Sequence, residues 1–191
     1  GVGKTHLVLE ISNQWRNVDG QESLFCDLTT ATDLLGIEQE LSKVLSIVLT
    51  PKDPWKQIGQ ALDEHGKTLL IFDNVEQVIG PANEAVQMLL SSCADISMVI
   101  TSRLKLGRED EQVIRLEPMS ILEGVELFLQ RAQQAYPAFT LTEQNRTFVG
   151  QIVNKLDRLP LAIELAAARA STLQVNEILE RLSERFSLLQ G

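Results

Sequence analysis

Hydrophobic residues in the first part of the chain follow two alternating patterns. Short apolar runs rich in β-forming residues are separated by stretches in which apolar residues recur every three or four positions. The apolar runs are residues 23–28 (SLFCDL), 68–73 (TLLIFD), 97–102 (SMVITS) and 112–116 (QVIRL). This alternation is typical of a parallel sheet covered by helices. It predicts a strand at each of these runs.

The periodic stretches in the same part predict helices. Their apolar stripes are Leu7, Val8, Ile11 and Trp15; Leu34, Leu41, Val44, Leu45 and Val48; Trp55, Ile58 and Leu62; and Ala85, Met88 and Leu89. We expect Asp53 and Pro54 to form the cap and first turn of the third of these helices, and Pro81 to begin the fourth.

From Ser120 onward the strand patterns stop and helical patterns continue. Ser120 and Glu123 have the spacing of a capping box. The apolar stripes here are Ile121, Val125, Phe128 and Ala132; Phe148, Val149, Ile152, Val153 and Leu156; and Val175, Ile178, Leu179, Leu182 and Phe186. Pro160 is expected to open an apolar helix. We therefore predict an α/β domain over residues 1–117 and a small all-helical domain over residues 118–191.

Net charge, cysteine content and the length of apolar runs exclude some classes of binding partner and of cellular location. The 191 residues carry a formal net charge of −9, which argues against a broad surface for nucleic acid or anionic membrane. The two cysteines, Cys26 and Cys93, lie in apolar segments without metal-ligand spacing and are expected to be buried reduced thiols. No apolar run approaches the roughly 20 residues that span a bilayer, and no signal peptide is visible, so we expect a cytoplasmic location.

The first five residues, GVGKT, carry the strongest chemical signal. In the phosphate-binding pattern G-x-x-x-x-G-K-[ST], backbone amides wrap the phosphates, the lysine reaches the β and γ oxygens, and the hydroxyl ligates Mg²⁺. Gly3, Lys4 and Thr5 match its last three positions, while its first glycine and the strand that feeds the loop would precede Gly1. The predicted nucleotide-binding residues at this end are Gly1, Val2, Gly3, Lys4, Thr5 and His6. The alternative is a glycine-rich turn before an ordinary helix.

Two acidic residues follow the most apolar run. Asp73 ends it, at the edge where an open parallel sheet binds its ligand, so Thr5 and Asp73 with phosphate oxygens would suffice to hold Mg²⁺. Glu76 is the nearest candidate to polarise an attacking water, or else a solvated residue at a helix start. We expect Asp73, Glu76 and Arg103 to form the catalytic set if hydrolysis occurs.

The neighbouring runs end in polar residues as well. Thr101, Ser102 and Arg103 would emerge at the same edge as Asp73, and Arg103 could sense the γ-phosphate or simply be an exposed side chain. Asp27 could order the site through a hydrogen bond or cap the following turn.

Taken together these motifs resemble the STAND class of P-loop ATPases, which includes the NB-ARC proteins, and especially the ATPase domains of bacterial transcriptional regulators. The segments that carry the resemblance are GVGKT at the start, LFCDL (24–28), LLIFDNVE (69–76), VITSR (99–103) and LDRLPLAIELAAARA (156–170). The resemblance implies a P-loop NTPase sheet lacking its first strand, which in this family lies between the strands at 97–101 and 112–116. These two segments are therefore not expected to pair directly.

The resemblance also implies roles for individual residues. Lys4 and Thr5 would bind phosphate and Mg²⁺, Asp73 would be the Mg²⁺ acid, Arg103 the sensor, and Pro160 with Leu161 would pack near the nucleotide. There are two departures from the family pattern. The glycine expected two residues before Pro160 is Arg158, and the residue after Asp73 is Asn74 rather than a second acid. The second departure favours slow hydrolysis and moves the catalytic role toward Glu76.

The function implied is an ATP/ADP-binding signal-transduction switch with weak ATPase activity, within a larger regulator. ADP would hold a closed state, ATP would permit self-association, and relatives continue beyond the position of Gly191 into effector and sensor regions. This part itself would contact neither nucleic acid nor membrane. Two alternatives remain open. One is a nucleotide-binding interaction module without turnover, and the other is an AAA+ type ATPase, for which Arg169 could be recruited toward the γ-phosphate.

Overall fold

The computed structural model describes residues 2–18 and 21–187 and divides the chain into two compact units. One unit comprises Lys4–Ile114, and the other comprises the residues from Arg115 onward together with those before Lys4. Gly1, a predicted nucleotide-binding residue, lies outside the described residues.

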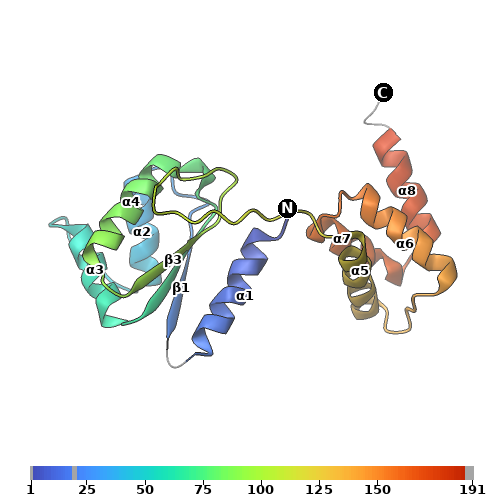
Figure 1. Cartoon of the computed structure of the whole chain (residues 1–191), viewed down its shortest axis with the longest axis horizontal. Helices are drawn as coiled ribbons and strands as arrows, with labels where there is room; N and C mark the ends of the chain where they lie inside the picture. Colours follow the sequence, from blue (N-terminus) through green and yellow to red (C-terminus); the bar gives the residue numbers. More distant parts are fainter. Residues whose placement is uncertain (1, 19–20, 188–191) are drawn as a thin grey trace. The chain divides into compact units, whose positions relative to one another are not determined.

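The first unit is an α/β fold. Its elements, in chain order, are α1 (Lys4–Arg16), β1 (Glu22–Asp27), α2 (Leu34–Val44), α3 (Pro54–Glu64), β2 (Thr68–Asp73), the 3₁₀ turn η1 (Val75–Gln77), α4 (Ile79–Ser92) and β3 (Ile96–Ile100) (Figure 1). The strands form a parallel sheet in the order β1-β2-β3. The predicted α/β class is therefore confirmed.

The predicted strand at residues 112–116 is wrong. No strand is present there in the described part of the chain, and β3 pairs only with β2. A short run of β-branched and apolar residues becomes a strand only when a neighbouring backbone supplies its hydrogen bonds. Residues 112–116 do not pair with residues 97–101. The segment has no regular secondary structure, and its Ile114 is 77% exposed.

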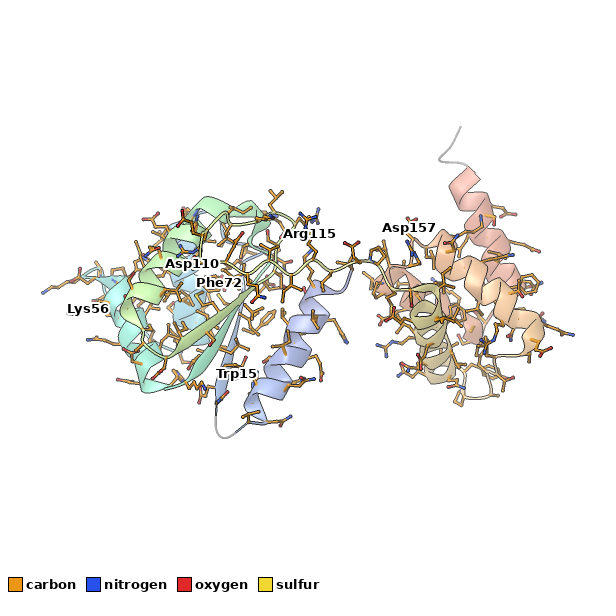
Figure 2. The ribbon with its side chains drawn as sticks, viewed as in Figure 1. Trp15, Lys56, Phe72, Asp110, Arg115 and Asp157 are labelled. Carbon is orange, nitrogen blue, oxygen red and sulfur yellow. The ribbon has the colours of Figure 1, made fainter. Side chains whose placement is uncertain are left out.

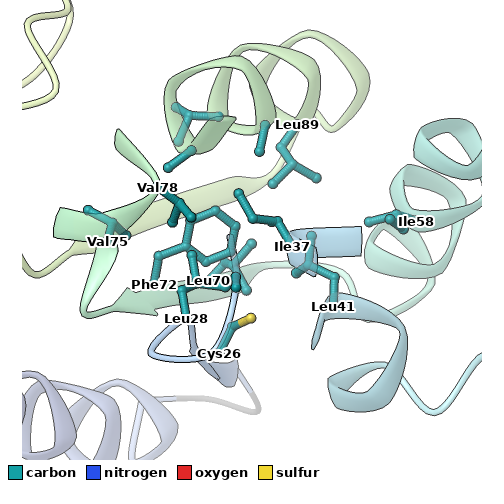
Figure 3. Packing of buried hydrophobic residues seen from close by; sticks show 14 of the residues in the cluster. Cys26, Leu28, Ile37, Leu41, Ile58, Leu70, Phe72, Val75, Val78 and Leu89 are labelled. Atoms are coloured by element: carbon teal, nitrogen blue, oxygen red, sulfur yellow. The ribbon is translucent and has the colours of Figure 1, made fainter. Parts of the chain in front are cut away.

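The sheet is covered on both faces, and the side chains of β2 alternate between them. On one face, Leu69 and Ile71 form a cluster with Val8 of α1, and Trp15 packs against this cluster (Figure 2). On the other face, Leu70 and Phe72 pack into the larger cluster formed with α2, α3 and α4 (Figure 3). All six residues of β2 are buried. A central strand that is buried on both faces has a nearly continuous apolar sequence, and this is why the sequence TLLIFD predicted a strand.

Several helix boundaries differ slightly from expectation. Asp53 occupies the N-cap of α3, but it has φ 53° and its side chain makes no capping hydrogen bond. α4 begins at Ile79 rather than Pro81, because proline is tolerated anywhere in a first turn whose N–H groups lack helical partners. Val48 lies beyond the end of α2 and is 92% exposed.

The second unit is helical. It contains α5 (Ile121–Ala135), α6 (Glu143–Lys155), α7 (Pro160–Ala167), the 3₁₀ turn η2 (Ala168–Ser171) and α8 (Val175–Ser187). The capping box at Ser120 and Glu123 is confirmed, and Thr142 forms another with Asn145. The core includes Phe128, Val149, Ile152, Ile163 and Ile178, whereas the side chain of Phe186 lies outside the described part.

Both cysteines are free and buried, as predicted. Burial raises the pKa of the Cys26 thiol to about 12, which keeps it protonated and unreactive. None of the helices in the described ranges is long and apolar enough to cross a membrane.

Candidate functional site

The candidate site lies where the three strands of the sheet end, and the register of the sheet aligns these ends. Asp27 at the end of β1 is the register partner of Asp73 at the end of β2, and Phe72 is the partner of Ile100 at the end of β3. Parallel strands end at the same edge, so the polar residues that end or follow these strands converge there. This edge is where the sequence placed the ligand.

Thr5, in the first turn of α1, reaches this edge. Its Oγ1 donates to Asp73 Oδ2 at 2.9 Å and to Asp73 Oδ1 at 3.1 Å, although the two residues are 68 positions apart in the chain. The structure therefore brings together the two residues that the sequence proposed as Mg²⁺ ligands.

Asp73 is a fully hydrogen-bonded carboxylate. The residue is only 2% exposed. Besides Thr5, Thr101 donates its hydroxyl to Oδ1, and Asn74 Nδ2 donates to Oδ2 at 3.0 Å. A buried carboxylate is tolerated when donors surround it, and these donors fix the plane of the carboxyl group.

Asn74 connects Asp73 to the end of β1. Its Nδ2 also lies 3.2 Å from Asp27 Oδ1 and 3.0 Å from Thr29 Oγ1. Asp27 in turn accepts from the Thr29 backbone N–H at 2.9 Å, so it both caps its turn and contacts the site. The hydrogen bond from the Thr29 hydroxyl is the main cause that lowers the pKa of Asp27, and it keeps this carboxylate ionised.

Glu76 and Arg103 form an ion pair with each other. Arg103 Nε lies 3.1 Å from Glu76 Oε1, with the Arg103 side chain 80% exposed and the Glu76 side chain 22% exposed. The second oxygen of Glu76, Oε2, is buried and has no hydrogen-bond partner. The structure thus joins the candidate water-positioning residue to the candidate sensor, a pairing that the sequence did not indicate.

The candidate phosphate-binding loop ends at the N-terminus of α1. Gly3 has φ +93°, a conformation that suits glycine, and it directly precedes the N-terminus of α1. Within residues 2–18 and 21–187, the ion pairs do not include the Lys4 ammonium. Lys4 therefore stands at a helix N-terminus without a competing carboxylate. Val2 is half-buried and His6 is exposed in the same segment.

Pro160 and Leu161 lie in the helical unit, where Pro160 begins α7 and Leu161 is 55% exposed. Arg158, in the turn before α7, stands where the resemblance led us to expect a glycine. It has φ 58°, a left-handed conformation in which glycine is favoured. Its carbonyl accepts from the Met119 N–H at 3.1 Å and its own N–H donates to Val153 O at 3.0 Å.

The donor set fits Mg²⁺ bound together with phosphates. The described part of the chain holds no group of three or more His, Cys, Asp or Glu side chains that could bind a metal ion by themselves. Mg²⁺ commonly takes one or two protein oxygens and completes its octahedron with phosphate oxygens and water. The pairing of one hydroxyl with one carboxylate, beside a free lysine at a helix N-terminus, matches that requirement.

Comparison with known proteins gives relatives but no family assignment. No protein-family model matches the chain. Over its whole length the chain is 33% identical to candidate HTH-type transcriptional regulators of Mycobacterium bovis and Mycobacterium tuberculosis, and it covers 22% of each. It is 32% identical to an uncharacterised protein of Mycobacterium tuberculosis and covers 49% of it. The chain therefore spans at most about half the length of these relatives.

Comparison with solved structures supports the fold. The chain is similar to a chain in the structure of Drosophila ORC bound to DNA, with a TM-score of 0.69 and 14% sequence identity, covering 100% of this chain and 60% of that chain. At this identity the similarity concerns the fold alone. The chain thus has a P-loop-like α/β fold and is similar to proteins named as regulators.

Proposed function

We propose that this chain is the nucleotide-binding module of a larger regulator and switches state with bound ATP or ADP. The observation that carries the proposal is the hydrogen bond from Thr5 to Asp73. It links the end of a phosphate-binding loop pattern to the acid at the end of β2, as a shared Mg²⁺ ion would require. Bound Mg²⁺ would neutralise charge on the β and γ phosphates.

Each residue of the candidate site has a defined role in this proposal. The backbone around Gly3 approaches the phosphates, Lys4 pairs with them, and Thr5 with Asp73 holds the metal. Thr101 and Asn74 keep the Asp73 carboxylate in one orientation through their hydrogen bonds. All of these groups lie at the positive N-terminus of α1 or at the adjacent sheet edge, where an anion is favoured.

Hydrolysis is proposed to be slow. Glu76, the candidate to position water, is engaged by Arg103, and its other oxygen is buried. The ion pair with Arg103 competes with water for Glu76 Oε1, and transfer of Arg103 to the γ-phosphate would remove that competition. This competition favours a switch over a fast enzyme, and it equally supports a second candidate, a nucleotide-binding interaction module without turnover.

The regulatory role is inferred from the relatives and from the motifs. The proteins named as transcriptional regulators are several times longer than this chain, which suits a module whose effector and sensor regions lie elsewhere. We propose a STAND-type cycle in the cytoplasm, in which ADP holds the resting state and ATP permits self-association. The similarity of fold to ORC is the observation that keeps an AAA+ type ATPase as an alternative.

The test is equilibrium binding of ADP and ATP to the full-length protein that contains this chain. Lys4→Ala should weaken binding of both nucleotides by about 100-fold or more, because phosphate charge is left uncompensated in a partly dry site. Lys56→Ala, which removes the same charge from an exposed position on α3 (Figure 2), is the matched control and should bind as the wild type does. Equal affinities of Lys4→Ala and wild type would refute the site. Phosphate release by the wild type then separates a slow ATPase from a module without turnover.

A further inference from the structure

The side chain of Asn74 joins the ends of two neighbouring strands. Its Nδ2 lies 3.0 Å from Asp73 Oδ2, 3.2 Å from Asp27 Oδ1 and 3.0 Å from Thr29 Oγ1. Two of these partners are carboxylate oxygens, which only accept hydrogen bonds when ionised. The amide must therefore direct its nitrogen toward them, which fixes its orientation.

The backbone conformation and the backbone N–H of Asn74 also suit this position. The residue has φ 63° and ψ 44°, the left-handed conformation that asparagine adopts more readily than most residues. Its N–H donates to Thr101 Oγ1 at 3.1 Å, and Thr101 in turn donates to Asp73. Glycine would satisfy the backbone alone. What asparagine adds is the set of hydrogen bonds made by its side chain.

The chemistry of the amide suits its place between two acids. Asp27 and Asp73 are register partners on adjacent parallel strands. An amide donates hydrogen to both carboxylates and adds no charge, whereas an aspartate at position 74 would remove the donor and add a third negative charge. Asn74 therefore makes hydrogen bonds to Asp27 and Asp73 that an ionised aspartate at this position could not make.

We propose that Asn74 is a positioning residue for Mg²⁺-dependent nucleotide binding. It holds Oδ2 of Asp73, while Asp27 and Thr29 hold Asn74 from the end of β1, so the loop after β1 contributes to metal affinity without touching the metal. The inference rests on the proposed function, since it assigns Asp73 to Mg²⁺. Hydrogen-bond partners of metal-ligating groups change metal affinity by about 10-fold to 100-fold when they are removed.

The test measures the Mg²⁺ concentration that half-saturates the tightening of ADP binding to the full-length protein. Asn74→Asp and Asn74→Gly should both raise this concentration by about 10-fold or more, while ADP binding in the presence of EDTA stays close to that of the wild type. Gln77→Glu adds the same charge at an exposed position of η1 and should leave the Mg²⁺ dependence unchanged.

A double-mutant cycle tests the path through Asp27. If Asp27 acts through Asn74, the variant carrying Asp27→Ala and Asn74→Gly should bind Mg²⁺ no more weakly than Asn74→Gly alone. Fully additive effects of the two substitutions would show that Asp27 acts by another route, and would overturn this part of the inference.

The remaining outcomes separate the inference from the proposed function. A wild type that shows Mg²⁺-dependent binding, with both Asn74 variants unchanged, overturns the positioning role and leaves the proposed function standing. A wild type without Mg²⁺-dependent binding overturns both. Urea unfolding without nucleotide supplies the structural control. A midpoint for Asn74→Gly near that of the wild type supports positioning, and a midpoint low enough to unfold the variant under the binding conditions shows a structural role instead.

Discussion

The two units of the chain bury different kinds of side chain. In the part of the chain that the structure describes, the buried polar residues all lie between Lys4 and Ile114, namely Ser12, Ser23, Thr68, Asp73 and Thr101. The helical unit has a core of apolar residues around Phe128 and Ile152. Buried polar groups need specific partners, so they fix geometry, whereas an apolar core chiefly supplies stability. Two of these buried polar residues, Asp73 and Thr101, belong to the candidate site in the α/β unit.

The largest stability effect is expected in the helical unit. Phe128 is fully buried, and its ring centroid lies 6.1 Å from that of Phe139. Phe128→Ala should lower the free energy of unfolding of this unit by about 3–5 kcal/mol, measured by urea denaturation. Leu122→Ala, on the same helix but 76% exposed, is the matched control and should have little effect. Similar losses in both variants would contradict the assigned core.

A comparable free-energy effect in the α/β unit should appear in binding. Asp73→Ala should weaken Mg²⁺-dependent nucleotide binding by about 100-fold, since it removes the metal-ligating carboxylate. Glu76→Gln should leave binding nearly intact and lower the rate of phosphate release by about 100-fold if Glu76 positions the water. Titrations in both variants separate the two roles. The assignment fails if both substitutions weaken binding equally.

Sequence patterns predicted most of the helices and strands because those depend on neighbouring residues. The buried run of β2 and the capping box at Ser120 are local features, and both were confirmed. The predicted strand at residues 112–116 failed because a strand also depends on a distant partner. Residues 112–116 have the apolar pattern of a strand but lack a partner strand in the described part of the chain.

In the candidate site, too, the local motifs were predictable from the sequence, whereas the contacts between distant residues were not. The pattern around Lys4 and the acid at Asp73 were visible as motifs, and the hydrogen bond between Thr5 and Asp73 is consistent with them. The contact of Asn74 with Asp27 spans 47 positions, and no spacing rule indicates it. The spacing of Asp27 and Thr29, which forms a hydrogen-bonded turn, was the one local sign of that network.

A close helix contact gives a smaller and sharper test of the helical unit. A Cβ added at Gly124 would lie 2.5 Å from Val153 Cγ1, so helices α5 and α6 approach each other closely at that point. Gly124→Ala should therefore destabilise the unit by about 1–3 kcal/mol through overpacking. Gly150→Ala is the control on α6, because an added Cβ there meets nothing within 4 Å. A Gly124→Ala protein as stable as the control would contradict this packing.

The smallest stability effect is expected at the ion pair between Arg103 and Glu76. Because Arg103 is largely exposed, Arg103→Ala should change the free energy of unfolding by less than about 1 kcal/mol. The same substitution should reduce the preference for ATP over ADP if Arg103 contacts the γ-phosphate. Parallel titrations with the two nucleotides measure that preference. An unchanged preference would remove Arg103 from the sensor role.

The central claim, that Thr5 and Asp73 share a Mg²⁺ ion with a nucleotide, has one direct measurement. Calorimetric titration of ADP into the full-length protein, with Mg²⁺ and with EDTA, is compared for wild type, Thr5→Ser and Thr5→Val. Serine keeps the hydroxyl that donates to Asp73, and valine keeps the shape without it. The account predicts that Mg²⁺ tightens ADP binding in the wild type and in Thr5→Ser, and that Thr5→Val loses at least about 10-fold of this gain. A Thr5→Val protein that keeps the full effect of Mg²⁺ would contradict it.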